Sequence, residues 1–82
     1  MSFTNHRWRT PFGRWVQGRS VSRLVQDLSS RGVPVTDHAI YMWVAGRRAP
    51  RVPAATAMVE LSGGTLTFDD IYRHSKLVTN GS

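Results

Sequence analysis

The spacing of the glycines along the chain is the feature that most constrains how it folds. Gly18, Gly32, Gly46 and the pair Gly63-Gly64 each follow a short segment in which apolar residues recur at helical spacing. Glycine adopts the left-handed conformation that ends a helix without steric cost, so each of these positions is expected to stop a helix. The pattern predicts several short helices, and no segment shows the alternation typical of a strand.

Residues that favour helix starts stand before most of these segments. Thr10 precedes Pro11, Ser20 opens the second segment, Thr36 precedes Asp37, and the run beginning at Thr67 fits a capping box. We therefore expect helices at about 11–18, 21–31, 37–45, 53–62 and 68–75. Their expected inner faces contain Phe12, Trp15, Val16, Val21, Leu24, Val25, Leu28, Ile40, Trp43, Val44, Ala54, Ala57, Met58, Leu61, Phe68, Ile71 and Tyr72.

The expected organisation is one all-α domain at residues 10–75, preceded by a basic arm at 1–9 and followed by a loose tail at 76–82. A chain of 82 residues has room for a single small domain with a modest core. Self-association would help such a domain to bury apolar surface, so a homodimer is expected.

Positive charge is concentrated in the first two thirds of the chain. The net charge is +6, and nine arginines but only two acidic residues fall within residues 1–51. Residues 52–82 hold two basic and three acidic residues. Arginine's planar guanidinium suits phosphate and guanine, so the charge favours a nucleic acid as partner over an ordinary solvated surface.

The composition argues against several other classes of function. There is no cysteine, which excludes disulfides and thiolate metal sites, and His6, His38 and His74 have no metal-ligand spacing. No apolar run approaches the roughly 20 residues of a membrane helix, and residues 1–9 lack the apolar core of a secretory signal. We expect no enzymatic activity, cofactor, metal, small-molecule ligand or membrane contact, and a cytoplasmic location.

One face of the third expected helix is unusual for a solvated surface. Ile40, Trp43 and Val44 cluster on one side, whereas His38, Tyr41 and Met42 fall on the other. An exposed patch of Tyr and Met beside a His indicates a surface that contacts a partner.

The segment from Thr36 to Pro50 resembles the recognition helix and exit of Cro-like (lambda-repressor-like) phage and bacterial regulators. In that family a capping Ser or Thr is followed by a buried aliphatic residue, a Trp, a Gly and a nearby Pro. Thr36, Ile40, Trp43, Gly46 and Pro50 occupy those places. The resemblance covers about residues 10–74 and implies a compact five-helix helix-turn-helix domain.

This chain departs from the family between the second and third helices. The family joins them by a tight turn, whereas residues 29–35 make a longer segment here. Either the second helix is extended by about a turn or the connector is looser.

The resemblance implies a set of DNA-contacting residues. A recognition helix at about 36–46 lies in the major groove, where its N-terminal residues meet base edges. The residues carried over for base readout are Thr36, Asp37, His38, Tyr41 and Met42. Those expected at the DNA backbone are Ser20, Ser22, Arg23, Arg47, Arg48, Arg7 and Arg9. Some of these residues have a plainer alternative: capping for Asp37, packing on the first helix for Tyr41, solvation for Arg47 and Arg48, and disorder for the arm.

The function expected from this resemblance is that of a sequence-specific, double-stranded-DNA-binding transcriptional regulator. It would act in a bacterial host, associated with the nucleoid, as a phage or mobile-element repressor on an inverted-repeat operator. Two alternatives remain: an excisionase-like architectural DNA-binding protein, and an antitoxin or phage protein that acts through contacts with another protein.

Overall fold

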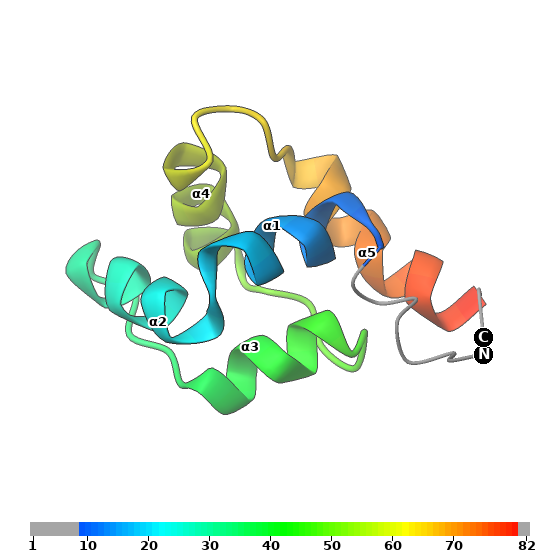
Figure 1. Ribbon diagram of the computed structural model, residues 1–82, viewed down its shortest axis with the longest axis horizontal. Coiled ribbons are helices and arrows are strands. Elements are labelled where there is room, and N and C mark those ends of the chain that lie inside the picture. Colours follow the sequence, from blue (N-terminus) through cyan, green and yellow to red (C-terminus); the bar gives the residue numbers. More distant parts are fainter. Residues whose placement is uncertain (1–8, 81–82) are drawn as a thin grey trace.

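The described part of the chain is entirely helical. A computed structural model describes residues 9–80, with side chains through residue 78. Its helices are α1 (Pro11–Arg19), α2 (Val21–Ser30), α3 (Asp37–Val44), α4 (Val52–Leu61) and α5 (Phe68–Asn80), and no strand occurs within these residues. In Figure 1, α1 crosses the middle of the molecule, with α2 and α3 below it, α4 above and α5 at the right. The all-α expectation is confirmed for the described residues.

Local capping starts the helices where the sequence predicts. The Thr10 and Thr36 hydroxyls accept hydrogen bonds from the backbone amides of Gly13 and Ala39, at 3.0 and 3.1 Å. At the start of α5, the Asp70 amide donates to Thr67 Oγ1 at 3.0 Å and the Thr67 amide donates to Asp70 Oδ2 at 3.1 Å. This reciprocal pair is a capping box with Asp in the usual place of Glu.

The junction between α1 and α2 is tighter than expected. Helix α1 does not stop at Gly18 but runs to Arg19, and Ser20 takes the positive φ of 79°. The Ser20 amide donates to the Val16 carbonyl at 2.9 Å, and its hydroxyl accepts from the Arg23 amide at 3.3 Å. Ser20 therefore ends one helix and begins the next, so the two helices meet without a loop.

The connection between α2 and α3 fits the longer connector rather than a second helix extended by about a turn. Helix α2 extends two residues past Leu28, less than a turn, and Gly32 closes it with a φ of 80°. The Val33 amide donates back to the Leu28 carbonyl at 2.9 Å. Arg31 and Gly32 form a turn, residues 33–36 then lead into α3, and α2 packs against α3.

All five helices contribute to one apolar core. Its fully buried side chains include Phe12, Val16, Leu24, Leu28, Ile40, Val44, Met58, Leu66 and Ile71. Trp43 is 6% exposed, as expected for a core residue. Trp15 is only partly buried at the edge of the core, where the Arg19 guanidinium lies 5.0 Å from the centre of its ring.

The C-terminal helix differs most from expectation. Residues 76–80 are helical rather than a loose tail, and α5 is the longest helix. It packs through Ile71, His74 and Val78, whereas Phe68 and Tyr72, expected to face inward, are 44% and 41% exposed. Val78 lies against Gly46, where an added Cβ would be 3.4 Å from the Val78 Cβ. Packing against the end of α3 thus accounts for the extra length of α5.

A buried histidine joins three helices. His74 is 1% exposed, and its Nε2 lies 2.7 Å from the carbonyl oxygen of Val44 in the last turn of α3. A carbonyl only accepts hydrogen bonds, so Nε2 carries a proton. Its Nδ1 lies 2.6 Å from the Thr10 hydroxyl, which also caps α1. In the neutral ring, the hydroxyl therefore donates to Nδ1 while accepting from the Gly13 amide, which satisfies every group in this network.

Candidate nucleic-acid interface

Helix α3 divides into a buried side and an exposed side. Ile40, Trp43 and Val44 are buried, whereas Asp37 and His38 are exposed and Tyr41 is 51% exposed. Met42 is half-buried at the boundary. The exposure of Tyr41 argues against the alternative in which its side chain packs on α1. The helical periodicity of the sequence thus predicted the two sides correctly except at Met42, which was expected to be exposed.

Thr36 and Asp37, two of the candidate base-reading residues, cap the N-terminus of α3. The Thr36 hydroxyl accepts from the Ala39 amide, and Asp37 Oδ1 accepts from the His38 amide at 2.9 Å. A carboxylate in the first turn also interacts favourably with the helix dipole. These contacts favour the capping role of Asp37, and they fix the backbone from which His38 and Tyr41 project.

The start of α2 supplies an exposed group of polar and basic side chains. Ser20, Ser22 and Arg23 are all exposed. Arg23 is 68% exposed at its side chain and approaches Asp27 only at 3.5 Å, a long ion pair. Such a guanidinium remains accessible to an external phosphate.

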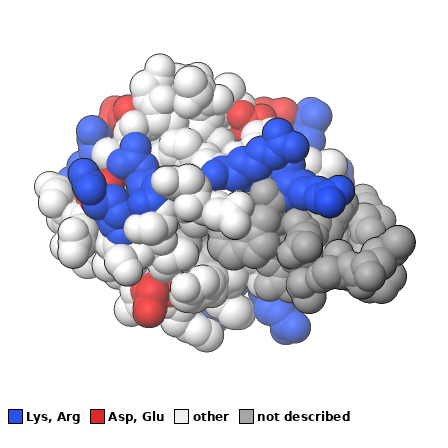
Figure 2. All heavy atoms as spheres, viewed as in Figure 1, with Lys and Arg blue, Asp and Glu red and all other residues white. Residues whose placement is uncertain are grey.

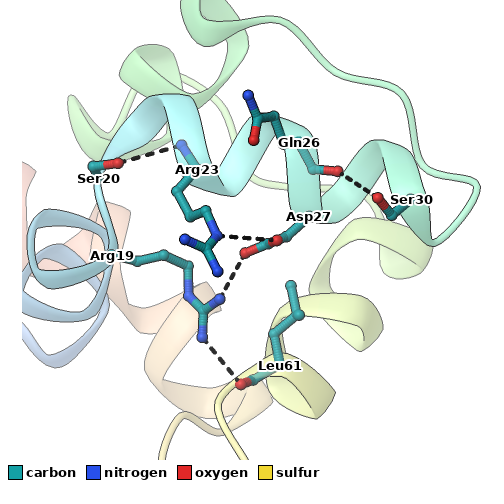
Figure 3. A network of polar contacts seen from close by, with 7 residues as sticks. All are labelled: Arg19, Ser20, Arg23, Gln26, Asp27, Ser30 and Leu61. Carbon is teal, nitrogen blue, oxygen red and sulfur yellow. Dashed lines mark hydrogen bonds and ion pairs between the residues drawn. The ribbon is translucent and has the colours of Figure 1, made fainter.

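A network behind this group connects α1, α2 and α4 (Figure 3). Arg19 Nη1 donates to Asp27 Oδ2 at 2.7 Å, and its Nη2 donates to the Leu61 carbonyl at 3.2 Å. Both charged side chains are largely buried, at 26% and 22% exposure. The eight-residue separation of Arg19 and Asp27 crosses a helix junction, so no local sequence pattern indicated this pair.

The two arginines that follow α3 occupy different surroundings. Gly46 has a φ of 78°, and the Arg47 amide donates to the Met42 carbonyl at 3.0 Å, which closes the helix. Both side chains are exposed, but only Arg48 lines the groove between the α2–α3 connector and the α3–α4 link. Of the expected arm residues, Arg9 is exposed just before α1, and Arg7 lies outside the described residues.

Basic side chains lie beside α3 rather than on it. In Figure 2 they gather over α1 and towards α2, while the surface over α3 is mostly uncharged. Arg14, Arg19 and Arg23 line a shallow open depression together with Trp15 and Gly18. A surface of this kind has positive charge beside a helix face that presents polar and aromatic groups and one acidic residue, Asp37.

Two further findings concern other classes of site. Within residues 9–80, no group of three or more His, Asp or Glu side chains is placed to hold a metal ion. In the same part of the chain, no helix combines the length and the apolar character needed to cross a membrane.

Comparison of the chain with protein-family models, with curated proteins and with solved structures finds no match.

Proposed function

We propose that this chain is a sequence-specific double-stranded-DNA-binding transcriptional regulator of the helix-turn-helix type, with α3 as its recognition helix. The observation that carries the proposal is the exposed side of α3. His38 and Tyr41 project outward from a short helix whose other side is anchored in the core. An α-helix fits the DNA major groove, where side chains on its outward side meet base edges.

The side chains on α3 suit base readout. The His38 imidazole donates to a guanine acceptor, and Met42 and the Thr36 methyl pack on a thymine methyl. Asp37, which caps α3, contributes to readout only if its carboxylate also accepts from a cytosine amino group. Tyr41 supplies a phenol and an aromatic ring at the centre of the exposed side.

The surroundings of α3 suit phosphate contacts. Ser20, Ser22 and Arg23 lie at the N-terminus of α2, which packs directly against α3. Backbone amides and the helix dipole attract phosphate there. Arg47 and Arg48 follow α3, and Arg9 and Arg7 precede α1. In this proposal the phosphate contacts supply affinity and orientation, whereas α3 supplies sequence discrimination.

The proposed form on DNA is a homodimer on an inverted repeat, with repression of a phage or mobile-element promoter as the outcome. A two-fold protein matches a two-fold operator, with half-sites about one helical turn apart.

The test is a selection of binding sites from random duplex DNA, followed by affinity measurements on the selected site. His38→Ala and Tyr41→Ala should each weaken specific binding by about tenfold or more, because one base contact is worth about 1–3 kcal/mol. Phe68→Ala is the matched control, since Phe68 is an exposed aromatic residue at the start of α5.

Three outcomes would count against the proposal. If the His38→Ala, Tyr41→Ala double variant keeps its specific affinity, α3 is not the element that reads the DNA sequence. Failure of the selection to enrich any sequence would remove sequence specificity. Strong DNA bending with weak sequence preference would favour the architectural alternative.

A further inference from the structure

We propose that a groove beside α3 binds an acidic, apolar peptide segment of another protein. The groove lies between the α2–α3 connector, α3, and the link from α3 to α4, and it has a volume of about 630 Å³. That volume falls within the range of about 300–1,000 Å³ typical of ligand-binding clefts. This site lies apart from the exposed side of α3 to which base readout is assigned above, and the two proposed surfaces share only Arg48.

Most of the residues that line the groove are apolar. Val33, Pro34 and Val35 of the connector form one wall, and Ala39 and Trp43 of α3 lie beside them. Pro53 and Ala54 at the start of α4 complete the lining. A recess of this composition gains free energy by burying apolar side chains of a partner, because water leaves both surfaces.

The rim of the groove is positively charged. Arg48 and Arg51 line it and are both exposed, and within the described residues neither has an ion-pair partner. By contrast, Arg19, Arg23 and Arg31 each have a carboxylate within 4.0 Å. The groove therefore offers two accessible cations beside an apolar recess, which complements an apolar segment with nearby carboxylates.

The carboxylates of this chain are already engaged. Asp27, Glu60 and Asp69 form ion pairs, whereas Asp37 and Asp70 accept backbone amides at helix starts. These five are all the acidic residues of the sequence. A second copy of the chain carries the same net charge of +6, and its carboxylates already have partners of their own, so the observations favour a different, acidic protein as occupant.

Duplex DNA is a poorer occupant than an acidic peptide. Phosphates would suit Arg48 and Arg51, but a charged backbone would lose its hydration against Val33, Val35 and Pro53 without gaining a partner there. A peptide places its apolar and acidic side chains separately, one kind in the recess and the other at the rim.

The experiment is a titration of the isotope-labelled full chain with a short synthetic peptide of leucine and glutamate, followed by NMR. Amide shifts should concentrate at Val33, Val35, Ala39 and Ala54. Peptides with Gln in place of Glu, or Ser in place of Leu, should each bind at least about tenfold more weakly. These two peptides test the charged and apolar parts of the proposal without altering the protein.

The matched protein variants are Arg51→Glu and Arg14→Glu, which make the same charge change at exposed sites on and away from the groove. Arg51→Glu should weaken peptide binding by about tenfold or more, and Arg14→Glu by less than about twofold. Because these titrations contain no DNA, a failure of the DNA-binding proposal would leave their result unaffected.

Several results would overturn this inference. One is the absence of saturable binding at millimolar peptide. Another is an equal loss with Arg14→Glu and Arg51→Glu, which would indicate non-specific attraction to a basic protein. A third is a duplex oligonucleotide that shifts the same groove amides and displaces the peptide, because the groove would then belong to the DNA surface.

Discussion

Replacing His74 by phenylalanine tests whether the buried histidine network holds α1, α3 and α5 together. The substitution keeps a ring of similar shape in the core, where His74 already meets Phe12 edge-on with ring centroids 5.1 Å apart. It removes both ring nitrogens and therefore the hydrogen bonds to Thr10 and Val44. The loss should come mainly from hydrogen bonding rather than from a cavity.

The magnitude follows from the two buried groups at the ends of those bonds. A buried polar group that loses its partner costs about 1–3 kcal/mol, so the pair should cost about 2–6 kcal/mol. For a domain of this size the free energy of unfolding is on the order of 4–12 kcal/mol. Since 1 kcal/mol shifts the melting temperature of a small domain by about 4–8 °C, we expect Tm to fall by about 10 °C or more.

The assay is thermal and urea unfolding followed by circular dichroism. His38→Phe is the matched control, because it makes the same chemical change at an exposed histidine and should alter stability by less than about 0.5 kcal/mol. Thr10→Ser keeps the hydroxyl that caps α1 and contacts His74, so it should cost far less than His74→Phe. If His74→Phe and His38→Phe destabilise the chain equally, the network has no structural role and the reasoning is refuted.

Three further perturbations test other parts of the structure. Gly46→Ala should lower the free energy of unfolding, measured by urea unfolding, by about 1–2 kcal/mol. Gly46 has a φ of 78°, and an added Cβ would lie 3.4 Å from the α5 backbone. Gly32→Ala should lower it by less, because Gly32 has a similar φ but open space around it. Asp27→Asn should lower the free energy of unfolding by about 1–3 kcal/mol, because the ion pair of Asp27 with Arg19 is largely buried. Glu60→Gln removes an exposed ion pair and should lower it by only about 0–1 kcal/mol in the same assay. Arg47→Ala should weaken binding to all duplexes alike and reduce the slope of log affinity against log salt by about 1, and an unchanged slope would rule out its phosphate contact.

Helix starts were predictable because capping is a local interaction. Thr10, Thr36 and Thr67 each bond an amide three residues ahead, so residue type and spacing suffice to predict the cap. The same holds for the two sides of α3, because helical periodicity alone separates Ile40 from Tyr41. The exposure of His38 and Tyr41 was therefore predictable from the sequence, whereas Met42, expected on the same side, is half-buried.

The length of α5 was not predictable from its own residues. Leu77 and Val78 are the only large apolar residues of its C-terminal half, and Val78 lies against Gly46 just after α3, a contact between segments far apart in the sequence. The end of α1 was not predictable from residue type either. Gly18 is the better helix stop by residue type, yet Ser20 takes the positive φ, and the longer α1 carries Arg19 onto Trp15 and Asp27.

By itself the sequence determined the helical class, the positions of most helix starts, the basic surface and the outward side of α3, because each depends on neighbouring residues or on composition. Only the tertiary structure decided the partners of His74, which include a residue 64 positions away, and the groove lined by Val33, Ala39 and Pro53. These features join segments that are distant in sequence. Their relative placement depends on how the whole core packs, which no local pattern specifies.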